Sequence, residues 1–226
     1  SGINTVEGNL TIGGEDEENP VTNLDGLKNL VSVRCDLTIT AAYTGETLAG
    51  LENLTACESL RIGSAAHPNE TLRQLSLPAL KEIKGDLCVY GTALQTADFK
   101  SLQSVAGHFV LQSDALLQLT ADELTTVAGN MTLIGTTADE AKAPCEQMYF
   151  PKLQRIDGTL TLSRFDRLSG LGTTFGVLTQ AGALRYEHLA LANTFEFPLI
   201  ETTGNITVTD CPILRSVLLP ALTDAG

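Results

Sequence analysis

The chain repeats one seven-residue phrase, Val127-Ala128-Gly129-Asn130-Met131-Thr132-Leu133, along most of its 226 residues. Each copy alternates apolar and polar residues, which is the two-residue period of a strand with one buried face. In most copies a glycine stands two residues before the central apolar residue and predicts a bend where the chain enters the strand. The central residues of the nine copies are Leu10, Leu37, Leu60, Leu87, Phe109, Met131, Leu160, Leu184 and Ile206.

The spacing of the copies separates a basal unit from insertions. Successive central residues lie 22 to 29 positions apart, so the basal unit is 22 residues and the excess is inserted. A second phrase, of which Leu77-Pro78-Ala79-Leu80 is one copy, precedes each strand after the first and ends six or seven residues before the next central residue. The insertions therefore fall between a strand and the next copy of the second phrase. We expect a solenoid in which both phrases are short extended segments.

A period in the low twenties is typical of the leucine-rich-repeat horseshoe and of the parallel β-helix. The horseshoe requires a ladder of buried Asn, which this sequence lacks at the corresponding offset. Only residues 119–124 and 139–148 have the composition for a turn or two of helix. We therefore predict an all-β, right-handed parallel β-helix of about nine turns that forms one domain over residues 1–226. At roughly 4.8 Å per turn its length would be on the order of 40 Å.

The two phrases resemble those of the receptor L domain, the β-helical module of insulin-receptor and epidermal-growth-factor-receptor ectodomains. The matching residues are the Val/Ile-x-Gly-x-Leu-x-Ile phrase and the Leu-rich phrase that follows it, seen at 72–80 and 213–222. Fungal GPI-anchored cell-wall proteins and bacterial surface proteins of leucine-rich-repeat type carry a similar pattern. The resemblance implies a secreted or cell-surface protein, such as a lipoprotein, anchored through a segment outside this sequence. The sequence lacks the Cys-rich modules and paired cysteines of the growth-factor receptors.

Charge and composition exclude several classes of partner. The net charge is −13, with the densest acidic run at residues 15–18, which we interpret as a solvated loop. Nucleic acid and anionic membrane surfaces require clustered Lys and Arg, so neither is an expected partner. No segment is apolar over the length of a transmembrane helix, so we expect no direct membrane insertion. The sequence does not indicate an oligomeric state.

The five cysteines form no metal-binding motif, and we expect no metal and no cofactor. Cys35 and Cys57 lie near the same corner of neighbouring turns, where a disulfide is conceivable, although five free thiols are the simpler interpretation. Asn-x-Ser/Thr sequons occur in five places, and only Asn69 falls in an insertion, where we expect it to be exposed. The other four sequons are at Asn9, Asn53, Asn130 and Asn205.

Alternation directs a second set of side chains outward from the sheet, mostly Thr, Asn and Asp. One group within it contains the residue types for nucleophilic catalysis, since Cys88 and Asp86 share a strand face beside His108 on the next turn. These residues lie on an open face without an oxyanion donor. Asp36 and Asp86 are two turns apart, about 10 Å, which exceeds the separation of glycosidase carboxylates. We therefore do not expect an enzyme, and a polysaccharide-active one is the least favoured hypothesis.

The hypothesis we favour is a non-catalytic recognition or adhesion module that binds an extracellular protein or glycan. Binding would use the sheet face and the loops at 13–22, 40–50, 63–72 and 135–149, because binding residues concentrate on loops held by a rigid scaffold. The alternative is a structural spacer in a cell-envelope protein. The residues that we expect to line the contact surface are Asp36, Tyr43, Arg61 and His67.

Overall fold

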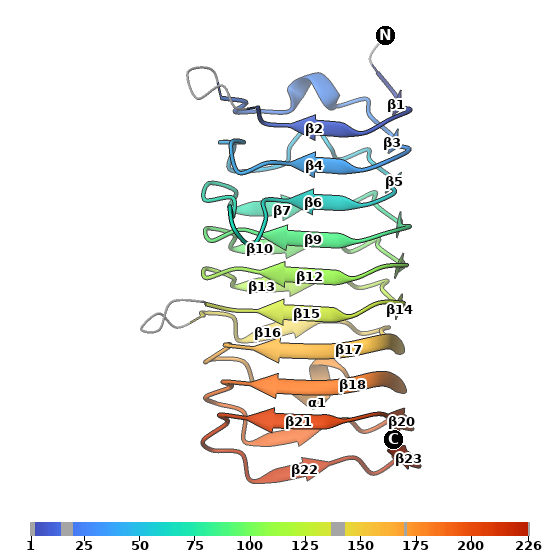
Figure 1. Ribbon diagram of the computed structural model, residues 1–226, viewed down its shortest axis with the longest axis vertical. Helices are drawn as coiled ribbons and strands as arrows, with labels where there is room; N and C mark the ends of the chain where they lie inside the picture. The colour runs from blue at the N-terminus through green and yellow to red at the C-terminus, as the bar shows by residue number, and fades with distance from the viewer. Residues whose placement is uncertain (1–2, 15–19, 137–142, 170, 226) are drawn as a thin grey trace.

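The computed structural model is a right-handed parallel β-helix of about nine turns (Figure 1). It describes residues 3–14, 20–136, 143–169 and 171–225. Every strand pairing among the described residues is parallel, and strands that follow one another along the rod come from successive turns. The expected all-β solenoid is confirmed. The acidic run at 15–18 and parts of the loops at 13–22 and 135–149 lie outside the described residues.

A 17-stranded parallel sheet forms two adjoining sides of the rod. The side where each turn begins consists of β1 (Thr5–Val6), β3 (Ser32–Val33), β5 (Ala56–Cys57), β8 (Glu82–Ile83), β11 (Ser104–Val105), β14 (Thr126–Val127), β20 (Thr202–Thr203) and β23 (Asp224–Ala225). The main side consists of β2 (Leu10–Ile12), β4 (Leu37–Ile39), β6 (Leu60–Ile62), β9 (Leu87–Tyr90), β12 (Phe109–Gln112), β15 (Met131–Ile134) and β21 (Ile206–Thr209). Two longer strands, β17 (Arg155–Ser163) and β18 (Gln180–Glu187), run through both sides.

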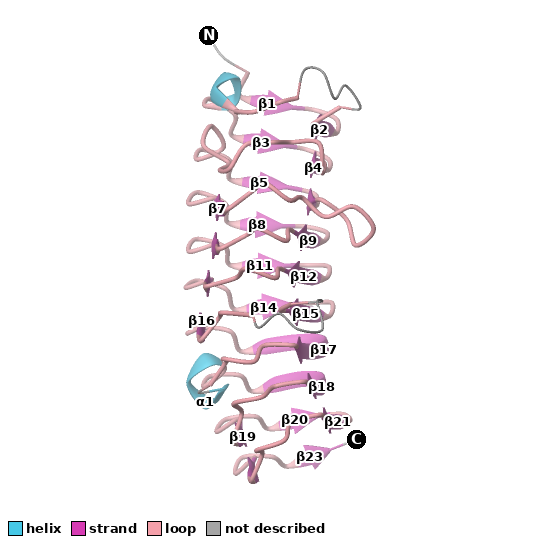
Figure 2. Cartoon of the chain, turned by 90° about the vertical axis from the view of Figure 1, so that its left-hand side faces the viewer, coloured by secondary structure: helices cyan, strands magenta, loops and turns pink. Residues whose placement is uncertain are grey.

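The third side closes each turn and is less regular. It carries a four-stranded sheet and a two-stranded sheet, which are separated by the short helix α1 (Leu171–Thr174). A 3-10 helix, η1 (Asp25–Leu27), lies at the same edge in the first turn (Figure 2). The strands of this side are β7 (Gln74–Ser76), β10 (Thr96–Asp98), β13 (Gln118–Thr120), β16 (Gln147–Tyr149), β19 (Thr194–Glu196) and β22 (Ser216–Leu218).

The central residues of the repeat form one row along the core, as the sequence predicts. Leu160, for example, pairs with Met131 on one side and with Leu184 on the other. The seven inner members of the row are completely buried. The two end members differ from the prediction, because Leu10 is only half-buried and Ile206 is 36% exposed where no further turn covers it. The predicted outward threonines, at 11, 38, 132, 161 and 207, pair with their outward neighbours and are exposed or half-buried.

The second phrase is a turn, so the expectation of an extended segment is wrong there. The amide of Leu80 donates to the carbonyl of Leu77 at 3.2 Å, and Leu102 donates to Phe99 at 2.9 Å. Proline favours the second position of such a turn because its ring fixes φ. Both ends of each of these two turns project into the core, so Leu77, Leu80, Phe99 and Leu102 are buried although the chain bends between them.

The two helical segments are not where the sequence suggested them. Leu119 lies in β13, and residues 121–124 form a turn. Of the second candidate, residues 143–146 have no helix, 147–148 belong to β16, and the rest lies outside the described residues. The helix α1 takes the place of a third-side strand between β16 and β19, where Leu168 and Phe175 anchor its ends in the core.

The insertions leave the stacking intact. The main strands pair in continuous register, and the one irregularity among their described pairings falls between Ile156 and Thr159. Loops emerge after the main strands, and Figure 2 shows the loop that follows β6 protruding from the side of the rod. The described residues of the insertions after β2, β4 and β6 that line a common groove therefore lie at one edge.

The core row predicts how truncations differ along the rod. Leu160→Ala should lower the free energy of unfolding by roughly 2–5 kcal/mol, because it leaves a cavity between two buried neighbours. Ile206→Ala removes a similar side chain that is already 36% exposed, and should cost about 1 kcal/mol or less. Urea unfolding monitored by circular dichroism compares the two variants. Equal losses would contradict the assignment of Ile206 to an uncovered end.

Candidate functional site

An open groove lies where the main side of the rod meets the loops of the first three turns. Its volume is about 660 Å³. The outward threonines of β2 and β4 form its floor, and the insertions after β2, β4 and β6 form its walls. The lining residues are Thr11, Gly13, Gly14, Thr38, Thr40, Ala41, Ala42, Gly63, Ser64 and His67.

The lining side chains are small, so the groove presents methyl groups, hydroxyls and backbone. Thr40 joins the first two loops, because its hydroxyl donates to the carbonyl of Gly13 at 3.1 Å and accepts from the amide of Ala42 at 3.2 Å. Gly13 has a φ of +91°, and a Cβ built there would lie 2.3 Å from Oγ1 of Thr40. A side chain at this position would therefore be strained and would also close the corner of the groove.

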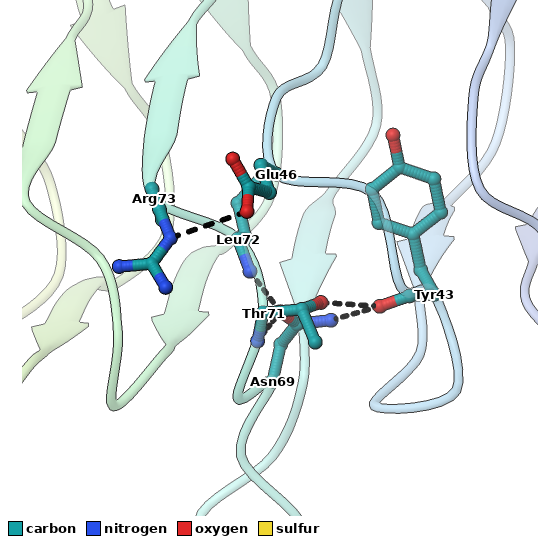
Figure 3. A network of polar contacts seen from close by, with 6 residues as sticks. All are labelled: Tyr43, Glu46, Asn69, Thr71, Leu72 and Arg73. Atoms are coloured by element: carbon teal, nitrogen blue, oxygen red, sulfur yellow. Dashed lines mark hydrogen bonds and ion pairs between the residues drawn. The ribbon is translucent and has the colours of Figure 1, made fainter.

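A buried asparagine fastens the second loop to the third (Figure 3). Nδ2 of Asn69 donates to the carbonyl oxygens of Tyr43, at 2.8 Å, and Thr40, at 3.2 Å. Its Oδ1 accepts from the amides of Leu72, at 2.7 Å, and Thr71, at 3.1 Å. The Thr71 hydroxyl adds a bond to the Tyr43 carbonyl at 2.9 Å. Asn69 is completely buried, so the network holds the groove walls from inside.

The burial of Asn69 overturns the expectation that it is an exposed glycosylation acceptor. Its amide nitrogen is engaged and inaccessible, whereas the other four sequon asparagines are exposed. The backbone N–H and C=O groups of a loop need hydrogen-bond partners within the protein. One Asn side chain can supply two N–H donors and an acceptor oxygen. The sequence contained a signal for this role, since Pro68 and Asn69 together favour a tight turn.

Tyr43 is also placed differently from the prediction. Its side chain is 1% exposed, and its hydroxyl donates to the carbonyl of Thr47 at 2.6 Å. Burial raises the pKa of this phenol above its ordinary value. The expectation that Tyr43 lines the contact surface is therefore wrong, because the second loop folds over its own aromatic residue. One aromatic side chain among small residues such as Ala42 and Gly45 was the available signal for a local core.

The other three predicted residues are on the outside of the rod. His67 is exposed and lines the groove. Arg61 pairs with Thr38 in the outward row, one turn beyond the groove floor, and forms an ion pair with Asp86 at 3.4 Å. Asp36 is half-buried in the neighbouring outward row. The structure thus brings His67 into the groove and leaves Arg61 and Asp36 near it.

The outward row that precedes the central residues is a ladder of side-chain acceptors. Each acceptor binds the backbone amide of the corresponding residue on the next turn. The bonds are Asn9 Oδ1 to Asp36 at 3.1 Å, Ser59 Oγ to Asp86 at 3.2 Å, Asp86 Oδ1 to His108 at 2.9 Å, His108 Nδ1 to Asn130 at 2.9 Å and Asn130 Oδ1 to Thr159 at 2.9 Å.

This ladder occupies the residues that resembled a catalytic group. Because Nδ1 of His108 accepts a backbone hydrogen bond, the neutral ring carries its proton on Nε2. The Asp86 carboxylate accepts from the His108 amide and from Arg61. The pKa of the Cys88 thiol is raised by burial and further by Asp86, while Arg61 opposes the shift. The geometry therefore does not favour a reactive thiolate at Cys88.

All five cysteines are free thiols, so the conceivable Cys35–Cys57 disulfide is not formed. Cys35 is exposed, whereas Cys57 and Cys145 are buried. Burial raises the pKa of Cys57 to about 12, with contributions from Asp36 and Glu58. Burial also raises the pKa of Cys145 to about 11, and this effect outweighs a hydrogen bond with the Gln147 backbone, which lowers the pKa. These two residues serve as small apolar core side chains.

The Asn69 network predicts a large loss on truncation. Asn69→Ala should lower the free energy of unfolding by on the order of 3 kcal/mol, because two buried carbonyls and two amides lose their partner. Asn53→Ala is the matched control, since Asn53 is an exposed sequon asparagine with one bond, to the Lys28 carbonyl at 2.7 Å. That variant should lose about 1 kcal/mol or less. If urea unfolding showed similar losses for the two variants, Asn69 would not be the fastener described above.

The buried thiols predict a dependence of stability on alkaline pH. Below the ordinary thiol pKa of 9.0 both states hold the proton, and the stabilisation is fully present. As the pH rises through the window from 9.0 to about 12 for Cys57, the unfolded state ionises first and stability is lost. Urea midpoints at about pH 8 and about pH 10 measure this loss. A Cys57→Ala, Cys145→Ala variant should show a smaller decrease, and an equal decrease would assign the effect to other groups.

Among the described residues, no three His, Cys, Asp or Glu side chains are grouped as a metal ion would need. No helix in the described part of the chain is long and apolar enough to cross a membrane. Comparison of the chain with protein-family models, curated proteins and solved structures finds no match.

Proposed function

We propose that this protein is a non-catalytic recognition module that binds an extracellular protein or glycan through the groove at its first three turns. The observation that carries the proposal is the groove itself, with a volume of about 660 Å³. Its walls are insertions that the repeat does not need, and the Asn69 network holds them in place. Binding residues concentrate on loops of this kind, positioned by a rigid scaffold.

The chemistry of the lining suits a ligand with many hydrogen-bonding groups. Thr11 and Thr38 offer hydroxyls from the floor, and the exposed His67 offers ring nitrogens from the rim. Glycine and alanine at the remaining positions let a ligand approach the backbone closely. Sugar hydroxyls or the backbone of an extended peptide supply the complementary groups. Arg61, next to the floor, adds a positive charge for which an acidic substituent on the ligand would compete with Asp86.

The absence of catalysis in this proposal rests on the state of the outward side chains. His108 and Asp86 are engaged in backbone contacts, and the pKa of Cys88 is raised. The extracellular location rests on the resemblance of the repeat to receptor L domains and fungal and bacterial surface proteins. An anchor would then be supplied by a segment outside this sequence. The net charge of −13 argues against nucleic acid and anionic lipid as partners.

The proposal predicts that filling the groove abolishes binding. Thr38→Tyr places a bulky ring on the groove floor, and tyrosine is well accepted on the exposed face of a strand. Thr161→Tyr, at the same outward position outside the groove, is the matched control. The wild type is first screened on an oligosaccharide array and a panel of extracellular-matrix proteins. For a ligand found there, Thr38→Tyr should weaken binding at least tenfold, about 1.4 kcal/mol, with Thr161→Tyr unchanged.

A ligand whose affinity survives Thr38→Tyr would place the site elsewhere. His67→Ala distinguishes a role for the rim, since its side chain is exposed and its loss should leave the melting temperature unchanged. If the screen yields no ligand, the spacer function becomes the better account. The continuous pairing of strands over about nine turns, which makes a stiff rod, favours that second candidate.

A further inference from the structure

The third side of the rod carries the one exposed aromatic side chain of the protein. All four tyrosines and seven phenylalanines lie within the described residues. The phenylalanines and two tyrosines are buried, a third tyrosine is half-buried, and Tyr149 is 43% exposed. Tyr149 pairs with Thr120 of the preceding turn, and the same outward position is Asp98 one turn before that. Stacking of the turns therefore does not require a ring at this position.

Two open hollows lie beside each other on this side of the rod. The first has a volume of about 310 Å³, and Asp98, Gln118 and Thr120 of β10 and β13 are among its lining residues. The second has a volume of about 320 Å³ and is lined by Gln147 and Tyr149 of β16 and by residues at α1. Gln118 pairs with Gln147, and Thr120 with Tyr149, so the hollows follow each other along the rod. We call these five side chains the third-side track.

The track and the ligand groove lie on different sides of the rod. Figure 1 shows β10, β13 and β16 behind the main strands. The groove belongs to the first three turns and has threonines of β2 and β4 as its floor, whereas the track begins at β10 of the fourth turn. A ligand bound at one site therefore leaves the other open.

Hydrogen bonds hold the side chains of the track in place. The Tyr149 hydroxyl donates to Oε1 of Gln147, which leaves the amino group of Gln147 to donate elsewhere. Nε2 of Gln118 donates to the Thr120 hydroxyl at 3.2 Å, which leaves Oε1 of Gln118 as an acceptor. Side chains that are already oriented, and that keep donors and acceptors in reserve, lower the entropy lost on binding.

These groups match the chemistry of a sugar. A pyranose ring has a face of C–H groups that packs on an aromatic ring, and a rim of hydroxyls that both donate and accept. Tyr149 supplies the aromatic surface, and the amides and hydroxyls beside it supply partners for the rim. β10 and β16 are two strand spacings apart, roughly 10 Å, so the track suits an extended oligosaccharide of about three units.

A peptide suits the track less well. An extended peptide that adds to a sheet gains affinity from main-chain hydrogen bonds to an open strand edge. Here β10 and β13 are each paired with a strand on both sides, so their edges are not open. The outward face of these strands offers side chains alone, and most of them are polar.

Charge favours a neutral sugar over an acidic one. Asp98 and Asp122 line the first hollow, beside Lys100. Oδ1 of Asp98 accepts from the Lys100 amide at 3.1 Å, which fixes the carboxylate on the face of the sheet. A carboxylate can accept from sugar hydroxyls, but it repels a uronic acid, and the net charge of −13 acts in the same direction.

We propose that the third-side track binds a neutral oligosaccharide that runs along the rod, with one sugar ring stacked on Tyr149. Gln147 and Gln118 bind hydroxyls of the neighbouring units, and Asp98 accepts from a hydroxyl at the other end of the track. The proposal does not rest on the function proposed for the groove, because no side chain is shared between the two sites.

Isothermal titration calorimetry with the hexasaccharides of cellulose, xylan, mannan, laminarin and chitin tests the proposal. At least one should bind the wild type with a millimolar or lower dissociation constant. For that hexasaccharide, Tyr149→Ala should weaken binding at least tenfold because the stacking surface is lost, whereas Tyr149→Phe keeps the ring and should stay within threefold. Leu117→Ala is the matched control, since Leu117 is 51% exposed on the preceding turn and lines neither hollow. Circular dichroism melts verify that each variant is folded.

Thr38→Tyr separates the track from the groove. It fills the groove floor and should leave the affinity for the hexasaccharide unchanged. If Thr38→Tyr abolished binding and Tyr149→Ala did not, the sugar would belong to the groove, which would overturn the track and support the function proposed above. The track would also be overturned if none of the five hexasaccharides bound, or if hexagalacturonate, which has a carboxylate on every unit, bound more tightly. A matrix protein whose binding alone depended on Tyr149 would replace the sugar by a protein partner.

Nitration by tetranitromethane gives a second readout that does not depend on a variant. Tyr149 is the one exposed tyrosine, so it should be nitrated before the other three. A hexasaccharide stacked on its ring should slow this nitration several-fold at saturation, as measured by mass spectrometry of tryptic peptides. An unchanged rate at saturation would show that the sugar does not cover Tyr149.

Discussion

Every feature of this protein depends on the requirement that one turn bury its apolar face against the next. A turn of about 22 residues cannot enclose a core alone, so the repeat is stable only as a stack. Stacking fixes the register, and the register fixes which outward side chains become neighbours. The acceptor bonds between Asn9 and Thr159 follow directly, because stacking brings each of these side chains within reach of a backbone amide one turn away. Polar surface residues thus take part in holding the turns together.

Insertions are compatible with this requirement only where they leave the stacked core residues of successive turns in register. They fall after the main strands, and a loop that leaves the stack must then supply its own interior. The second loop buries Tyr43, and the third contributes Asn69, whose amide satisfies backbone groups of both loops. The groove lies between these loops and the threonines of β2 and β4. The groove therefore depends on two things: the periodic stack of strands, and hydrogen bonds within the loops that satisfy the loops' own backbone groups.

The repeat in the sequence was enough to predict the features that recur in every turn. It carried no information about the loops, which differ from turn to turn, and the predictions there failed. The central row, the parallel pairing and the outward threonines followed from spacing, because a register shift would expose the core. The turn at Leu77–Leu80 was misjudged because its first and last residues face inward in a turn as they would in an extended segment. Tyr43 and Asn69 were placed at the surface because their burial depends on contacts between two loops, which neither loop's sequence reveals alone. His67 depends on no such contact, and it lies exposed at the groove.

The same ladder that stabilises the rod also limits what its face can do chemically. A histidine can act as a base only with a free ring nitrogen directed at a substrate, and Nδ1 of His108 already holds the Asn130 amide. Moving that ring would release a backbone amide of the next turn and weaken the register on both sides. Side chains free of the ladder, such as Thr11 and Thr38, carry no such cost when they meet a ligand. A ligand would therefore disturb the stack least at the row of threonines, and the groove lies on that row.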